Sequence, residues 1–397
     1  MMYSDALLTL GILFSVGLLA DQIGHRTRIP RVTLLLVCGL GAGAFDLLPD
    51  QFSALTDIVM VAALTLVAFL LGGSLQPKTL RTHGLAILTI SIAIVSLTLG
   101  IVTVGLWLLG VELALALILA SIATATAPAA TLDVLKQVGH SNGFTCTLEG
   151  IVAIDDVWGL LTFSLCLTLA SSIAISDGQA GFSALYEIGG AIVLGGLIGL
   201  PATYLSGRIK AGEPLQIEAL AISFLTAGLA VTLDVSFLIS GIVVGALIAS
   251  LAQHHRRAFH EIEHIKLPFM IVFFILAGAS LDLSSVKELG FVGLALVALR
   301  VIARLLGGWV GASLAREPKP LRHLYGPALL PQAGVSIGMA LIAGLTFPQW
   351  KDQIMALIVG TTVVFELFGP FCTMWAVRKS APIQCSDAPA QRLHKGA

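Results

Sequence analysis

Six charged side chains stand inside long apolar stretches of this sequence, where a charge needs a partner. They are Glu149, Asp155, Asp156, Arg300, Arg304 and Glu366. At the centre of a bilayer, each charge would cost about 2.5 to 3.5 kcal/mol on insertion scales if nothing compensated it. We therefore expect these side chains to pair with one another, to face water, or both.

Asp155 and Asp156 are the most informative of the six because they are neighbours. Adjacent residues on a helix point about 100° apart, so one arginine cannot easily serve both. We therefore expect that one of the two carboxylates is free to bind something else. Arg300 and Arg304 lie one turn apart on one helix face, and either could neutralise Asp155 or Glu366. A buried ion-pair cluster that only fixes helix register is the structural alternative.

Glu149 lies seven residues before Asp156, hence on the same helix face and about 10 Å away. This spacing suits a wet funnel that leads from the cytoplasmic end of the helix toward the middle of the membrane. A solvated acid at a helix end is the alternative interpretation. Glu366 is interpreted as a structural partner of one of the arginines.

The elements that position these residues are predicted to be membrane helices. Hydrophobic residues make up 57% of the 397 residues and charged residues only 11%, where soluble domains carry about 25% charged residues. This composition excludes a soluble enzyme, a nucleic-acid-binding protein and a disordered chain. With a net charge of -1, the protein has no overall positive potential that would attract polyanionic partners. We predict an all-α polytopic protein of the lipid bilayer with about 13 transmembrane helices and no cofactor. The apolar segments lie near residues 6–22, 31–47, 54–73, 84–109, 111–135, 143–172, 182–206, 215–233, 236–252, 267–283, 289–315, 324–346 and 351–377.

The distribution of Lys and Arg predicts the orientation. With these segments, 18 of the 22 basic residues fall in connections on one side. The positive-inside rule places that side in the cytoplasm. We expect an odd number of spans in a cell (inner) membrane, with the N-terminus outside and the C-terminus inside.

Two of the segments contain residues that interrupt helices. Pro128 stands among threonines and alanines in the fifth segment, and Pro331 and Gly334 stand in the twelfth. A proline kink would explain either one alone. Their separation by seven segments predicts that the two run in opposite directions, as in the inverted repeats of secondary transporters. The predicted transmembrane domain, 1–378, then comprises repeat one (about 1–175), a linker helix (about 180–208) and repeat two (about 212–378), followed by a short cytoplasmic tail at 379–397.

Several short motifs occur in a specific order along the chain, and together they resemble the cation/proton antiporter superfamily. The resemblance is strongest to its KefB-like branch of monovalent cation:proton antiporters, within the sodium/hydrogen exchanger family. The motifs are Arg28-Ile-Pro-Arg31, Thr126-Ala-Pro128-Ala-Ala-Thr131, Ala153-Ile-Asp-Asp-Val-Trp-Gly159, Phe273-Phe-Ile-Leu-Ala-Gly278 with Ser280-Leu-Asp282, Pro331-Gln-Ala-Gly334, and Phe365-Glu366 before Gly369-Pro370.

The resemblance implies a secondary transporter, not an enzyme, that exchanges a monovalent cation for protons by alternating access. It implies an antiporter fold with crossed broken helices, and a homodimer in which a core domain moves against a dimerisation domain. Asp156 would be the exchanging carboxylate, Asp155 the carboxylate held by a basic residue, and Thr126 a backbone or hydroxyl ligand. Na+ is the expected cation. K+ remains the alternative, because Ala127, Ser74 and Gln76 stand where many relatives carry acidic residues that could be ligands.

Two functions of other classes remain open from the sequence. A sensor built on the same scaffold would not transport at all. His260-Glu-Ile-Glu-His264 matches the HExxH pattern of zinc proteases. It lies in a basic connection, and no downstream span offers a convincing third ligand. We expect no metal site beyond that of the transported cation.

Overall fold

A computed structural model of the chain describes ten stretches of it. They are residues 2–27, 31–45, 52–74, 84–139, 142–174, 180–206, 215–251, 268–279, 290–332 and 335–380. Almost all of these residues are helical. Gly334, the Arg28-Ile-Pro part of the first motif and the His260–His264 pattern lie outside the described residues.

The helices follow the order of the expected apolar segments. The first half contains α1 (Met2–Thr27), α2 (Arg31–Ala44), α3 (Phe52–Ser74), α4 (Gly84–Leu108), α5 (Leu113–Ile122), α6 (Pro128–Val138) and α7 (Gly143–Ala174). The second half contains α8 (Ala180–Ser206), α9 (Leu215–Thr232), α10 (Phe237–Leu251), the apolar helix Pro268–Ala279, α13 (Gly290–Leu314), α14 (Tyr325–Ala328), α15 (Val335–Thr346), the short turn η1 (Pro348–Trp350) and α16 (Lys351–Ser380).

Each expected apolar segment coincides with a helix, or with two helices where an interruption was expected. Five helical stretches are long and apolar enough to cross a membrane by length and composition: Gly84–Leu108, Gly143–Ile173, Tyr186–Tyr204, Gly290–Leu314 and Pro348–Ser380. The other apolar helical stretches are 10–17 residues long. The number of crossings and the division into repeats therefore stay predictions.

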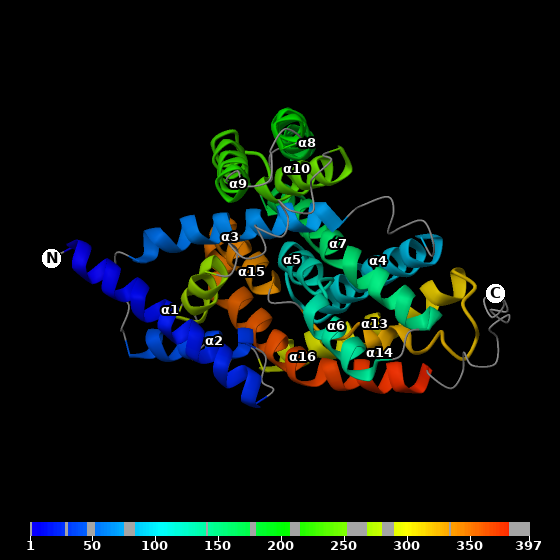
Figure 1. Ribbon diagram of the computed structural model, residues 1–397. Helices are drawn as coiled ribbons and strands as arrows, with labels where there is room; N and C mark the ends of the chain where they lie inside the picture. The colour runs from blue at the N-terminus through cyan, green and yellow to red at the C-terminus, as the bar shows by residue number, and fades with distance from the viewer. Residues whose placement is uncertain are drawn as a thin grey trace, which may run out of the picture.

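Two groups of helices are visible in the fold (Figure 1). In one group, α8, α9 and α10 stand together at the top of the view beside α3; in the other, α4, α5, α6, α7, α13, α14 and α16 lie below and to the right. Helices α3 and α10 approach closely because each has a glycine at the contact. A Cβ on Gly72 would collide with the carbonyl oxygen of Ile242, and one on Gly245 with that of Phe69.

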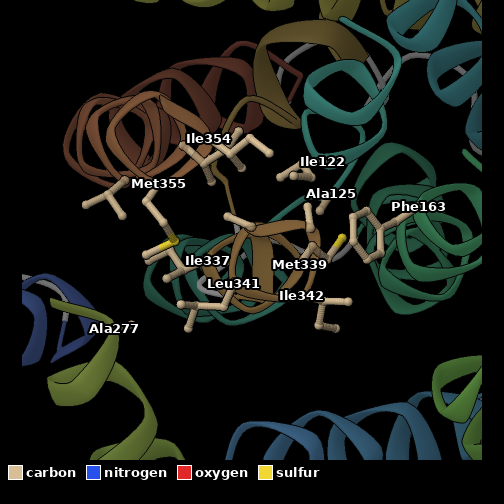
Figure 2. Close-up of a cluster of buried hydrophobic side chains, with 14 of the residues drawn as sticks. Ile122, Ala125, Phe163, Ala277, Ile337, Met339, Leu341, Ile342, Ile354 and Met355 are labelled. Atoms are coloured by element: carbon tan, nitrogen blue, oxygen red, sulfur yellow. The ribbon is translucent and has the colours of Figure 1, made fainter. Parts of the chain in front are cut away.

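Helix α15 is buried in the middle of the hydrophobic core. Figure 2 shows Ile337, Met339 and Ile342 of this helix surrounded by side chains from α5, α7 and α16, including Ile122, Phe163 and Met355. Residues Ser336 to Gly344 are all buried. A helix that is apolar on all sides is typically buried. Helix α15 is the second part of the interrupted segment 324–346, so its packing fixes that segment among the neighbouring helices.

Both segments predicted to be interrupted do break. Helix α5 ends at Ile122, residues 123–127 are not α-helical, and α6 begins at Pro128. Proline suits the first position of a helix, where its missing N–H is not needed. In the other segment, α14 is a single turn and residues 330–332 have no helical structure.

Candidate ion-binding site

Asp155 lies on α7 opposite the first break, and three side chains from three other segments hold its carboxylate. Thr126 donates its hydroxyl hydrogen to Oδ2 at 2.9 Å, and Ser91 of α4 donates to Oδ1 at 3.3 Å. Arg304 of α13 forms an ion pair with Oδ2 at 3.3 Å. Both charged side chains are fully buried. The geometry therefore assigns Arg304 to Asp155, a choice that the sequence left open.

Arg304 also serves the C-terminal end of α5. Its Nη2 donates to the carbonyl oxygens of Thr124 and, at 3.4 Å, of Ala123. The last carbonyls of a helix have no partner within the helix and carry partial negative charge. The guanidinium satisfies two of them while it neutralises the carboxylate.

Arg300, one turn before Arg304 on α13, contacts both breaks. Its Nε donates to the carbonyl of Ala123 at 3.0 Å and its Nη2 to that of Ala125 at 3.0 Å, both in the first break. Its Nη1 donates to the carbonyl of Leu330 in the second break at 2.8 Å. The planar guanidinium presents donors in a fixed fork, so it can join three acceptors that come from two distant segments.

The two breaks also bond directly to each other. The N–H of Ala127 donates to the carbonyl of Pro331 at 3.1 Å. Ala127 is the N-cap of α6, and its own backbone N–H, which has no partner within the helix, finds its acceptor in the other half of the chain. A specific hydrogen bond thus joins the two interrupted segments, which were expected to cross.

A long helix packs against each break through a glycine. A Cβ on Gly159 of α7 would lie 3.3 Å from Cα of Ala125, and one on Gly369 of α16 would lie 2.6 Å from Cα of Pro331. One turn before Gly159, α7 places Asp155 against Arg304. One turn before Gly369, α16 places the ring of Phe365 against Arg300, whose Cζ is 4.1 Å from the ring centroid.

The other expected site residues are placed as follows. Asp156 is 6% exposed and Glu366 7% exposed, so both carboxylates are buried. Glu149 is exposed on the first turns of α7, and Pro128 and Pro331 lie at the two breaks. The structure brings Asp155, Thr126, both arginines and the two breaks together.

Two contributors were not foreseen from the sequence. Ser91 is one of several hydroxyl residues on the apolar helix α4, and nothing in its neighbourhood distinguishes it. Phe365 was noted only as part of a motif, but its ring covers the Arg300 guanidinium. Nothing in a single sequence marks Ser91 as a site residue. The motif includes Phe365, but its contact with Arg300 cannot be predicted from the sequence.

Comparison with known proteins agrees with this architecture. Residues 10–379 match the family model described as sodium/hydrogen exchanger, transmembrane. The match spans nearly the whole chain, so the chain belongs to the sodium/hydrogen exchanger family. It is a multi-pass membrane protein that acts as a cation/proton antiporter and is not an enzyme. The resemblance described from the sequence motifs is confirmed.

Individual relatives are distant but cover most of the chain. The sequence is 26% identical over 374 residues to Na+/H+ antiporter 1 of Methanocaldococcus jannaschii, with 88% of this chain and 85% of the relative covered. It is 23% identical over 359 residues to the Na+/H+-K+ antiporter GerN of Bacillus cereus, with 87% and 90% covered.

The fold is similar to that of a solved structure, the sodium proton antiporter MjNhaP1 from Methanocaldococcus jannaschii at pH 8. The TM-score is 0.76 at 19% identity, and the similarity covers 96% of this chain and 99% of that one. The all-helical antiporter fold is therefore shown.

Proposed function

We propose that the protein exchanges Na+ for protons by alternating access, with Asp156 as the exchanging carboxylate. The observation that carries this proposal is the way in which Asp155 is held. Arg304, Thr126 and Ser91 all direct donors at its two oxygens. A carboxylate held in this way cannot exchange its partners cheaply, because each would lose a buried charge-assisted hydrogen bond. The adjacent Asp156 points about 100° away on α7 and is the better candidate for exchange.

Thr126 is proposed as a second ligand of the cation. Its hydroxyl donates its hydrogen to Asp155, and the oxygen keeps lone pairs that can face a cation. The proposed ligand set is therefore the Asp156 carboxylate together with an oxygen of Thr126. Asp155 contributes negative charge nearby.

Alternating access requires that cation and proton compete for one site. If only the occupied carrier switches between the two sides, protons moving down their gradient drive the cation the other way. Glu149, exposed at the start of α7, is proposed to collect cations or protons at the cytoplasmic mouth.

The architecture that we propose for this cycle consists of two inverted six-helix repeats joined by a linker helix (about 180–208), about 13 helices in total. Repeat one (about 1–175) contributes α5, α6 and α7, and repeat two (about 212–378) contributes α14, α15 and α16. The bond between Ala127 and Pro331 supports a crossing of the two broken helices. We further propose a homodimer in a cell (inner) membrane, with the N-terminus outside and the C-terminus in the cytoplasm.

One alternative ion has specific support. K+/H+ exchange is favoured by the name of one relative, the Na+/H+-K+ antiporter of Bacillus cereus.

The test is proton flux in proteoliposomes that contain a pH dye, with Na+, Li+ and K+ added in turn. We expect a cation-dependent pH change in the unmodified protein and its loss in Asp156→Asn. Glu112→Gln is the matched control, because this acid is exposed at the start of α5 and remote from the break. Exchange retained in Asp156→Asn would contradict the assignment of Asp156. A response to K+ alone would select the alternative ion, and no response to any of the three cations would contradict the proposed exchange.

A further inference from the structure

A group of basic side chains lies where α13 and α16 end. Residues 315–324 connect α13 to α14, and residues 378–380 end α16. Together these two segments carry five Lys or Arg side chains and one acid. The five, called the basic patch below, are Arg316, Lys319, Arg322, Arg378 and Lys379. All of them are exposed except Arg322, which is half-buried.

The connection and the end of α16 pack against each other. Leu321 of the connection belongs to the same buried cluster as Val377 of α16. Nearby, Thr373 of α16 donates its hydroxyl hydrogen to the carbonyl of Ala328 at the end of α14, at 2.9 Å. Figure 1 shows both segments at the same end of the molecule. The basic patch is therefore one surface, although its members come from two parts of the chain.

The exposed apolar faces of both helices lead to the basic patch. Exposed apolar side chains recur every three or four residues on each helix, namely Val364, Phe368, Phe371 and Trp375 on α16 and Ile302, Leu305 and Trp309 on α13. Lys379 follows Trp375 by one turn, and its ammonium group lies 4.9 Å from the centre of that ring. Arg316 follows the end of α13 by two residues. In a multi-pass membrane protein lipid tails cover such faces, so the patch lies at the level of the head groups.

Arg316 occupies a backbone position that favours glycine. Its φ is 60°, in the left-handed region. Its N–H donates to the carbonyl of Ser313 at 3.2 Å, and the N–H of Glu317 donates to the carbonyl of Ala312 at 2.9 Å, which is the Schellman ending of a helix. A residue with a side chain costs about 1 to 2 kcal/mol in this conformation. An interaction of the arginine side chain would offset that cost.

The acid of the connection does not neutralise the basic patch. Glu317 is half-buried and lies near the hydroxyl of the buried Tyr325. Its backbone carbonyl, not its carboxylate, accepts a hydrogen bond from Nε of Arg322 at 2.7 Å. None of the five basic side chains forms an ion pair with another residue that the structure describes. The patch therefore presents positive charge at the membrane surface, where anionic phospholipids carry the complementary charge.

We propose that the basic patch binds the phosphate of an anionic phospholipid whose tails cover the exposed faces of α13 and α16. A soluble phosphate would match the charge but would leave the apolar faces without a partner, so a lipid fits the surface better. Arg316 and Lys319 contribute charge from the connection, and Arg378 and Lys379 contribute it from α16. The bound head group then joins the two segments, and the folded protein is stabilised because the lipid binds it and not the unfolded chain. This binding is independent of the proposed exchange.

The test is the melting temperature of the purified protein in a neutral detergent, with and without added phospholipid. We expect phosphatidylglycerol, which is anionic, to raise the melting temperature by several degrees. Phosphatidylcholine, which has no net charge, should have little effect, and neither should inorganic phosphate or glycerol 3-phosphate at the same concentration. An equal rise with phosphatidylcholine, or with either soluble phosphate, would overturn the proposal of an anionic lipid.

Substitutions locate the effect on the protein. Arg316→Gly should change two quantities in opposite directions: the melting temperature without lipid should rise, because glycine favours this φ, and the gain from phosphatidylglycerol should fall to less than half. Lys379→Gln should reduce the gain in the same way without raising the starting value. Lys351→Gln is the matched control, because it removes a positive charge at the opposite end of α16 and should keep the full gain.

Two results would contradict the assignment to the basic patch. One is a full gain from phosphatidylglycerol in both Arg316→Gly and Lys379→Gln. The other is an equal loss of the gain in Lys351→Gln, which would show that any positive charge on the protein serves. If Arg316→Gly does not fold, Lys319→Gln takes its place beside Lys379→Gln, and the same two results decide the question.

Discussion

The ion pair between Asp155 and Arg304 joins α7 to α13 across 149 residues of sequence, at an N–O distance of 3.3 Å. Arg304 is at the same time bonded to two carbonyls at the end of α5. One guanidinium therefore fixes a carboxylate and a helix end that lie on separate elements.

Replacing Arg304 by Gln should destabilise the protein by about 3 to 5 kcal/mol, because it leaves the Asp155 charge buried without its partner. The free energy of unfolding in detergent, obtained from thermal or denaturant unfolding, is the measurement. Asp155→Asn combined with Arg304→Gln should cost less than the sum of the two single changes. Additive effects would show that the pair is not coupled.

Replacing Arg300 by Lys should loosen both breaks while leaving one positive charge in place. A lysine ammonium cannot reproduce the fork that reaches Ala123, Ala125 and Leu330. Hydrogen–deuterium exchange should rise at the Ala127 N–H, which bonds to Pro331, and should stay unchanged in α9. Unchanged protection of the peptides from both breaks would contradict this role.

Removing the Thr126 hydroxyl should weaken the hold on Asp155. A hydrogen bond to a charged group contributes about 1.5 to 3 kcal/mol, so Thr126→Val should lower stability by that amount. Thr126→Ser keeps the hydroxyl and should lie close to the unmodified protein. A melting temperature of Thr126→Val equal to that of Thr126→Ser would show that the bond contributes nothing.

The contact between α3 and α10 depends on the absence of a side chain at Gly245. Its Cβ would collide with the Phe69 carbonyl, so Gly245→Ala should cost about 1 to 3 kcal/mol through overpacking. Gly228→Ala in α9 is the control, because a Cβ there meets nothing within 4 Å. It should be neutral or stabilise by up to about 1 kcal/mol, since alanine favours helix. Equal melting temperatures for the two variants would argue against close packing of these helices.

Much of the helical framework could be predicted from the sequence because burial in a bilayer leaves a strong signal. Apolar runs located the long helices of the described residues, and Pro128 and Pro331 located both interruptions to within a few residues. Three of the charges inside these runs, Asp155, Arg300 and Arg304, lie at the breaks. These features could be predicted because a charge or a proline inside an apolar helix raises the free energy of the folded protein unless a specific contact compensates it.

The partners of those charges could not be predicted in the same way. Arg300 and Arg304 have the same chemistry and share a helix face, and only the positions of α5 and α7 relative to α13 distinguish them. The acceptors of Arg300 are backbone carbonyls, which every residue has and no sequence marks. Ser91 contributes through its position on α4, and that position depends on helix packing.

The dependence of both breaks on α13 has a consequence for how the protein is made. Residues of α5 and α7 leave the ribosome well before Arg304, which follows Asp155 by 149 residues. At about 5 to 20 residues per second, that interval is roughly 7 to 30 s. Throughout it, the carbonyls that end α5 and the carboxylate of Asp155 have no guanidinium to bind. The first half of the chain must therefore enter the membrane with its charged centre incomplete, in contact with water, lipid head groups or the insertion machinery. The arrival of α13 then supplies both guanidinium groups to the first break, and the second break, whose residues follow α13 in the chain, joins them afterwards.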